Sequence, residues 1–288
     1  MQIGIIGDIH GRVFHALAAV TIWQLTTGKP FDLLLHVGDL GAFPDPTQLD
    51  AATKRYLDAD PAETDFSRML QSQGERAAIL SDLRQHFATP IYFPRGNHED
   101  FVWLNQLPVD PASQTAQVDP FDFFRYVPDG TVLEFDSVTL AFLGGVQERT
   151  DAAAIDCEAH QSLLQLAPNA VDIMVTHQGP YGSSVSRRGD IYGSPLITEL
   201  IEHLRPTFHV AGHAHVLSGP QLYGQTTYLG LDCLVASPIW QPEARGLQAG
   251  CLAVIDTDKG ELWPVTDEWL AAFDTPFDLE KWCRRIFA

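Results

Sequence analysis

Seven side chains of types that bind divalent metal ions follow short apolar runs in this sequence. They are Asp8, His10, Asp39, Asn97, His177, His213 and His215. Metal coordination explains why carboxylate, amide and imidazole groups recur in this setting, since all three are ligands of divalent ions. Two divalent cations about 3.5–4 Å apart could share the set, with Asp39 as the bridging ligand. The sequence therefore predicts a dinuclear metal centre.

A dinuclear centre of this composition suits a phosphate ester as substrate. Two divalent ions bring four positive charges, of which Asp8 and Asp39 neutralise two and a bridging hydroxide a third, so positive charge remains for the phosphate. Because metal binding lowers the pKa of water toward neutrality, the bridging hydroxide is the expected nucleophile. His98, next to Asn97, is the candidate general acid for the leaving oxygen. The predicted reaction is metal-dependent hydrolysis of a phosphate ester.

Four arginines near these motifs are candidates for binding the outer oxygens of the phosphate. They are Arg12, Arg95, Arg187 and Arg188. A guanidinium group offers several N–H donors in a plane and matches phosphate geometry. The ligands are oxygen and imidazole groups without a thiolate, so the metal ions are expected to be Mn, Fe, Zn, Co or Ni. The donor set does not choose among these metals, and manganese is the favoured expectation.

Short apolar runs must place the metal ligands at one edge of a sheet. The runs cover residues 3–6, 33–37, 91–93, 171–175 and 208–211, and each precedes one of the ligand motifs. Runs with little polar alternation predict strands buried on both faces. Helical period appears between them, in residues 13–25, 75–87 and 196–204. Strands that alternate with helices predict an α/β fold, with the site at the carboxyl edge of the strands.

The later part of the chain predicts a second sheet. Strand signals become denser from about residue 126, in residues 132–135, 138–143, 226–229, 234–236 and 251–255. Residues 279–287 predict a closing helix, residues 105–122 a loop, and residues 42–74 an insertion that covers the site. Because no repeat or low-complexity tract divides the sequence, we predict a single domain over residues 1–288.

Five blocks of the sequence resemble, in the same order, the signature of the calcineurin-like metallophosphoesterases. The blocks are Gly7-Asp8-Ile9-His10-Gly11, Gly38-Asp39, Gly96-Asn97-His98-Glu99, His177 and Gly212-His213-Ala214-His215. The resemblance implies a four-layer α/β/β/α sandwich of two mixed sheets, with the dimetal site at the C-terminal edge of the strands. It also implies two ligand shells that share Asp39. One metal would be held by Asp8, His10, Asp39 and His215, and the other by Asp39, Asn97, His177 and His213.

The resemblance leaves the substrate open. The first and third blocks are similar to those of the Ser/Thr phosphoprotein phosphatases and their bacterial relatives. Those enzymes carry a second Asp after the Gly-Asp motif, which orients the catalytic His, whereas residues 40–43 here are Leu-Gly-Ala-Phe. Residues 193–206 and the long stretch between Asp39 and Asn97 more loosely resemble the lariat-debranching phosphodiesterases. We therefore expect a monoester or diester of a small phosphorylated molecule or nucleotide, with a protein phosphatase and a non-catalytic metal-binding scaffold as alternatives.

The composition bears on the binding partners and the cellular compartment that we expect. The 288 residues carry a net charge of −19, which repels polyanions and disfavours a broad nucleic-acid-binding face. The four cysteines are far apart and form no Cys-x-x-Cys pair, so we expect free thiols in a reducing compartment. With neither a signal peptide nor an apolar run of about 18 residues, a cytoplasmic protein without a membrane anchor is predicted. No obligate protein partner is evident.

Overall fold

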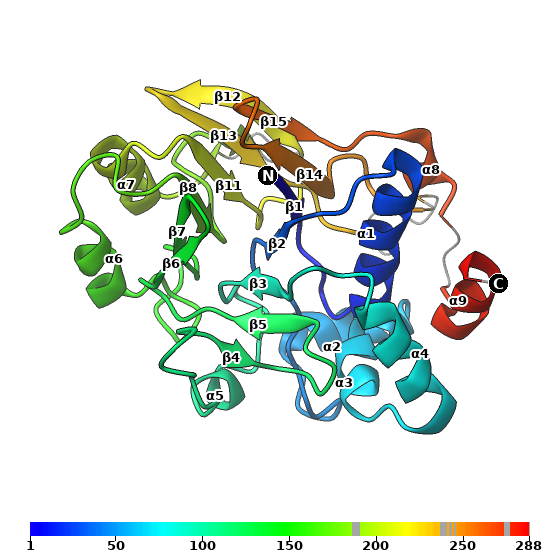
Figure 1. The fold of residues 1–288 in the computed structure, drawn as a ribbon. Helices are drawn as coiled ribbons and strands as arrows, with labels where there is room; N and C mark the ends of the chain where they lie inside the picture. The colour runs from blue at the N-terminus through cyan, green and yellow to red at the C-terminus, as the bar shows by residue number, and fades with distance from the viewer. Residues whose placement is uncertain (186–190, 237–240, 242–243, 245, 274–276, 288) are drawn as a thin grey trace.

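Two large mixed β-sheets dominate the computed structural model, which describes residues 1–185, 191–236, 241, 244, 246–273 and 277–287 (Figure 1). The first sheet has the strand order β15-β14-β1-β2-β3-β5-β4. Its strands are β1 (Gln2–Ile6), β2 (Leu33–His36), β3 (Ile91–Phe93), β4 (Ala116–Gln117), β5 (Phe124–Tyr126), β14 (Leu252–Asp256) and β15 (Glu261–Pro264). β1, β2, β3 and β5 run parallel to one another, whereas β4, β14 and β15 pair antiparallel with their neighbours.

The second sheet has the strand order β12-β13-β11-β8-β7-β6. Its strands are β6 (Val132–Phe135), β7 (Val138–Leu143), β8 (Ile173–Thr176), β11 (Phe208–Ala211), β12 (Ser218–Tyr223) and β13 (Thr226–Gly230). β7, β8, β11 and β13 are parallel, and β6 and β12 are the antiparallel edges. A small hairpin joins β9 (Ser184–Val185) and β10 (Ile191–Tyr192). The strands that precede the predicted ligands are thus parallel strands of the two sheets, as expected for carboxyl ends that meet at one edge.

Alternation of side chains along the strands divides the apolar residues into three cores. Ile3 and Ile5 of β1 pack with Phe142 and Val175 of the second sheet, in the core between the sheets. Ile6 points the other way and belongs to the core that holds α1. A third core lies between the second sheet and its helices. Three apolar interfaces require four layers, and the predicted α/β/β/α sandwich is confirmed.

Helices form the two outer layers, and the three predicted from helical period are confirmed. α1 (Val13–Thr27), α4 (Gly74–Arg84), α8 (Glu268–Ala271) and α9 (Leu279–Ile286) lie outside the first sheet (Figure 1). α6 (Cys157–Leu163) and α7 (Pro195–Leu204) lie outside the second, and the short α5 (Phe101–Leu104) follows β3. Every side chain of residues 13–21 is buried, because α3 (Asp65–Leu70) and α9 cover the side of α1 that turns away from the sheet.

The segment predicted as an insertion, residues 42–74, lies against the turn that follows β1. It contains α2 (Ala51–Leu57), the 3-10 helix η1 (Pro61–Thr64) and α3. Arg12 forms ion pairs with Asp60 and Glu63, at 2.8 and 2.6 Å. The backbone N–H of Phe66 donates to the Gly11 carbonyl at 3.0 Å. These contacts anchor the segment beside the first ligand motif.

One strand prediction is wrong. Residues 234–236 form no strand, although their apolar side chains suggested one. The Leu234 N–H donates to the Asp8 carbonyl at 2.8 Å, and the Leu234 carbonyl accepts from the Gln248 N–H at 3.0 Å. The segment therefore supports the turn that carries Asp8 instead of entering a ladder. In the part of the chain that the structure describes, no helix combines the length and apolar character needed to cross a membrane.

Candidate metal centre

The predicted ligands converge in space into two groups that share Asp39. Asp8, His10, Asp39 and His215 each offer a ligand atom within 4.8 Å of the others, and so do Asp39, His177 and His213. The Nε2 atoms of His10 and His215 lie 3.0 Å apart, and Nε2 of His215 lies 3.0 Å from Oδ2 of Asp8. The amide oxygen of Asn97 lies 3.0 Å from Nε2 of His177, which adds it to the second group. All seven candidate ligands are therefore brought together.

Four of these residues adopt a left-handed backbone conformation that non-glycine residues rarely adopt. They are His10 (φ 48°), Asp39 (φ 57°), His213 (φ 66°) and His215 (φ 49°). Each such residue costs about 1–3 kcal/mol unless its surroundings hold it in place. The concentration of strain at the ligand turns points to a functional site, because strain of this kind clusters where geometry matters for binding.

Motif glycines allow the two carboxylates to lie close to neighbouring turns. A Cβ atom on Gly96 would lie 2.0 Å from Oδ1 of Asp39, and one on Gly212 would lie 2.0 Å from Oδ1 of Asp8. Both distances are far inside van der Waals contact. The glycines therefore leave the room that the carboxylates occupy.

Asp39 holds three ligand turns together. Its carboxylate Oδ1 accepts hydrogen bonds from the backbone N–H groups of Asn97 and His98, at 2.6 and 2.8 Å. Its backbone carbonyl accepts from the N–H groups of Ile9 and His10, at 3.1 and 2.8 Å. The turns after β1, β2 and β3 are thus joined at this residue, which both candidate groups share.

Two further features fit a bound cation. Oδ1 of Asp8 is buried and has no hydrogen-bond partner among the described residues, although its partner atom Oδ2 accepts from the His213 N–H at 2.9 Å. Nδ1 of His177 donates to the Val37 carbonyl at 3.0 Å, which leaves the lone pair of Nε2 directed toward Asn97 and Asp39. A buried acceptor without a donor and an imidazole fixed in the ligand tautomer are what a metal site requires.

The electrostatics of the second group also favour a positive charge. Burial opposes the charged form of His177, but the carboxylate of Asp39 outweighs it and raises the pKa of His177 to about 9. The side chain of His177 is fully buried, so this preference arises from the protein itself and not from solvent. A divalent ion satisfies the same demand for positive charge.

His98 stands beside the ligands and has a carboxylate partner that the sequence motifs did not reveal. Nδ1 of His98 lies 2.6 Å from Oδ2 of Asp50, which belongs to the segment 42–74. Burial alone would lower the pKa of His98, but the carboxylates of Asp39 and Asp50 outweigh it and raise this pKa to about 9. Burial favours the neutral acid at Asp50, yet the hydrogen bond to His98 lowers the pKa of Asp50. The structure thus places an acidic partner on the ring even though the second Asp of the phosphatase motif is missing.

Asp50 was missed because its signal in the sequence belongs to a different role. Its Oδ1 accepts from the Thr53 N–H at 2.7 Å and caps the N-terminus of α2. An Asp before a helix is an ordinary N-cap, and nothing in its spacing indicates a contact with a residue 48 positions away. Only the path of the segment over the site brings the two side chains together.

The predicted contacts between arginines and the substrate have less support in the structure than the predicted metal ligands. Arg12 is buried, and its guanidinium donates to Asp60, Glu63 and the His10 carbonyl. Arg95 donates to Asp129 and to the carbonyls of Ala152 and Ala154, each at 2.7 Å. Because other partners occupy both guanidinium groups, we do not retain them as contacts to substrate. Arg187 and Arg188 lie outside the described residues.

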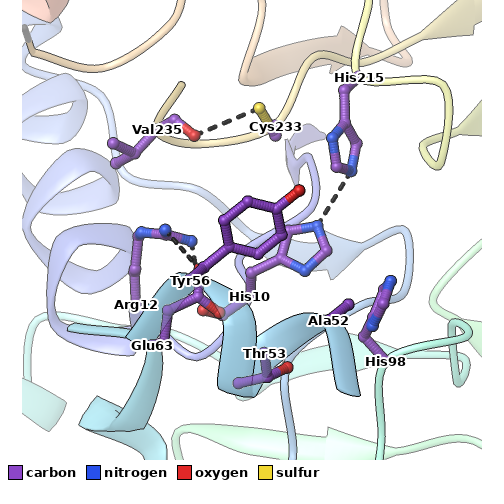
Figure 2. A pocket seen from close by; sticks show the side chains of 10 residues that line it. All are labelled: His10, Arg12, Ala52, Thr53, Tyr56, Glu63, His98, His215, Cys233 and Val235. Carbon is purple, nitrogen blue, oxygen red and sulfur yellow. Dashed lines mark hydrogen bonds and ion pairs between the residues drawn. The ribbon is translucent and has the colours of Figure 1, made fainter. Parts of the chain in front are cut away.

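A cavity of about 220 Å³ opens beside the ligands. Figure 2 shows His10 and His215 linked on one side of it, with His98 nearby and the side chains of α2 in front. The segment 42–74 contributes Ala52, Thr53, Tyr56 and Glu63 to the lining of this cavity.

Comparisons with known proteins agree with this geometry. The calcineurin-like phosphoesterase family model matches residues 1–217. No curated protein shows a significant match to the chain. Among solved structures, TT1561 of Thermus thermophilus has a TM-score of 0.50 at 12% identity, covering 92% of this chain and 98% of that one. Another crystal structure reaches a TM-score of 0.53 at 11% identity, with the same coverage. At such identities the likeness concerns the fold alone. Because the family model spans about three-quarters of the sequence, the chain belongs to the calcineurin-like phosphoesterase family and is a phosphoester hydrolase.

Proposed function

We propose that this protein hydrolyses small phosphate esters with two divalent metal ions. The main observation behind this proposal is that seven side chains with oxygen or imidazole ligand atoms converge in two groups that share Asp39, beside the His98–Asp50 pair. The first ion would be held by Asp8, His10, Asp39 and His215. The second would be held by Asp39, Asn97, His177 and His213. Manganese is the ion proposed for the first tests, since the donors are oxygens and imidazoles.

The proposed chemistry divides between the ions and the side chains. When bound, the ions would act as Lewis acids on the phosphoryl oxygens and lower the pKa of a water nucleophile. His98 would donate a proton to the leaving oxygen, because its ring lies beside the candidate ligands and is paired with a carboxylate. Asp50 would hold the ring by its Nδ1 atom, so that Nε2 is the proton donor.

The expected substrate is a small phosphorylated molecule or nucleotide. The cavity beside the ligands measures about 220 Å³ and is lined in part by α2, which favours a small substrate over a folded phosphoprotein. The net charge of −19 disfavours a long nucleic acid. Monoester and diester cleavage both fit the donor set, and the ratio of turnover on a monoester to turnover on its diester counterpart distinguishes them.

A direct assay tests the proposal. The protein is loaded with Mn²⁺ and given 4-nitrophenyl phosphate, bis(4-nitrophenyl) phosphate and a phosphopeptide. Turnover of the first or second ester, with at least a hundredfold loss of kcat in Asn97→Ala, would support the proposal. A larger loss of kcat on an alkyl phosphate than on 4-nitrophenyl phosphate in His98→Ala would support the general acid. Dominant turnover of the phosphopeptide would favour the protein phosphatase alternative. Binding of both ions without turnover of any ester would favour a non-catalytic scaffold.

A further inference from the structure

The cavity beside His98 lies on the side from which a leaving group departs. A general acid must reach the leaving oxygen within hydrogen-bond distance, so the alcohol part of the ester lies next to His98. The cavity begins at His98, His10 and His215 and extends to α2 and Val235 (Figure 2). An ester bound at the candidate ligands would therefore place its alcohol part in this space, if the proposed function is correct.

The walls of the cavity are largely apolar and enclose a small volume. Ala52, Tyr56 and Val235 supply carbon atoms, and Thr53 and Tyr56 supply hydroxyl groups. In Figure 2 the ring of Tyr56 stands in front of the cavity, with its hydroxyl on the side of His215. Sites for drug-sized ligands usually measure about 300–1,000 Å³. A volume of about 220 Å³ suits a compact group with an apolar body.

The charges around the cavity exclude a second anionic group. Arg12 is the permanent cation among the described residues that line it, and its side chain is only 4% exposed. Its guanidinium is 2.8 Å from Asp60 and 2.6 Å from Glu63, so two carboxylates already face one positive charge. His98 also lines the cavity, and its Nδ1 lies 2.6 Å from Oδ2 of Asp50, so a positive charge on that ring is paired as well. A carboxylate or phosphate on the leaving group would be desolvated there without a partner.

We propose that this cavity is a leaving-group site that selects phosphate esters of compact, uncharged alcohols with an apolar body. It discriminates against esters whose alcohol carries a carboxylate or a second phosphate. The inference rests on the proposed function, because it assigns the cavity to the alcohol part of a substrate held by the candidate metal ligands.

A matched series of substrates tests the selectivity on the intact protein loaded with Mn²⁺. The series consists of ethyl phosphates that carry a terminal phenyl, hydroxyl, carboxylate or phosphate group. The phenyl ester should have the highest kcat/KM, and the carboxylate and phosphate esters should fall about tenfold or more below it, because like charges repel in this partly buried space. Equal kcat/KM for the phenyl and carboxylate esters would overturn the proposal.

A pair of variants on α2 tests the location. Ala52 lines the cavity, whereas its neighbour Ala51 is exposed and does not line it. Ala52→Trp should lower the phenyl-to-hydroxyl ratio of kcat/KM about tenfold by filling the space, and Ala51→Trp should leave this ratio as in the wild type. An unchanged ratio in folded Ala52→Trp would overturn the assignment. If Ala52→Trp does not fold, the substrate series on the wild-type protein still tests the proposed selectivity. Failure of the wild type to hydrolyse any of the esters would instead refute the proposed function.

Discussion

The side chain of Asp50 both caps a helix and contacts His98. One carboxylate oxygen caps α2 through the Thr53 N–H, and the other lies 2.6 Å from Nδ1 of His98. In the phosphatases that the sequence resembles, an Asp just after the Gly-Asp motif orients the catalytic His, and this chain has no Asp there. A residue eleven positions after Asp39 reaches the same ring from a different segment. The orientation of His98 is therefore a property of the folded segment 42–74 and not of the motif itself.

Substitution of Asp50 with Asn separates helix capping from the charged contact with His98. Asn caps helices about as well as Asp, so Asp50→Asn should keep α2 while removing the charge at His98. We expect kcat to fall about tenfold to a hundredfold for an alkyl phosphate, whose leaving oxygen needs a proton. The 4-nitrophenyl ester needs little assistance and should change about twofold. Steady-state kinetics on both esters make the comparison, with Asp58→Asn at the exposed far end of α2 as control. Equal losses on both esters would argue against a role in proton donation.

Asp65 provides a test of pH-dependent stability away from the site. Burial raises the pKa of Asp65 to about 6, and the ion pair with Arg68 only partly offsets it. Because an unfolded Asp has a pKa near 3.9, the native state binds this proton more tightly. The contribution of Asp65 to the free energy of unfolding therefore falls as pH rises from about 4 to 6.

Relative to Asp65→Asn, the wild type should lose roughly 2–3 kcal/mol of unfolding free energy between pH 4 and pH 7. Urea unfolding of both proteins across that range measures the difference. A difference that stays constant with pH would mean that the carboxyl titrates normally.

Among the elements, the turns after the strands carry the chemistry. Their glycines and polar residues stand out in the sequence, and the strands β1, β3 and β11 were predicted from apolar runs that differ from the observed bounds by one residue or none. The left-handed conformations of His10, Asp39, His213 and His215 left no such trace. They arise because each turn is held by contacts from other turns, as at Asp39, and such contacts are not encoded by local propensity.

Contacts between distant segments also explain the two main differences between the prediction from sequence and the structure. The Asp50–His98 contact depends on the path of a long segment with few apolar runs. Residues 234–236 have a strand-like composition, but the backbone of Leu234 forms one hydrogen bond to the Asp8 turn and one to Gln248 instead of joining a strand. In both cases tertiary contacts decide the outcome.

One glycine in these turns gives a sharp test of the ligand geometry. A methyl group on Gly212 would overlap Oδ1 of Asp8, so Gly212→Ala should displace that carboxylate and weaken Mn²⁺ binding about tenfold or more. Isothermal titration calorimetry measures the affinity, and circular dichroism checks the fold. Gly224→Ala is the control for backbone strain away from the site, because its φ is 60° but a Cβ atom there meets nothing within 4 Å. Unchanged affinity in Gly212→Ala would argue that Asp8 is not a ligand.

For the whole molecule, the site is a junction between the two sheets. Asp39 and Asn97 follow strands of the first sheet, and His177 and His213 follow strands of the second. Ions held by all four would join the sheets at one edge of their shared core. Metal binding should therefore stabilise the complete fold and not only the local turns.

Metal removal measures this stabilisation. An ion present at a hundred times its Kd adds about 2.7 kcal/mol to the free energy of unfolding, which corresponds to roughly 5–10 °C in Tm for a chain of this size. Thermal unfolding with Mn²⁺ and with EDTA should differ by that amount. The shift should shrink in Asn97→Ala, and equal Tm values under both conditions would contradict a bound ion at this junction.

The antiparallel pairing of β14 with β1 has a consequence for synthesis in the cell. A ribosome adds all seven candidate ligands by residue 215, but β14 begins only at residue 252. Until that strand emerges, the backbone groups of β1 on that side lack their partner, and an unpaired strand edge invites pairing with other chains. A nascent chain that already carries every ligand therefore still exposes the strand that positions Asp8 and His10. β14, which is made after all seven candidate ligands, covers this edge of β1.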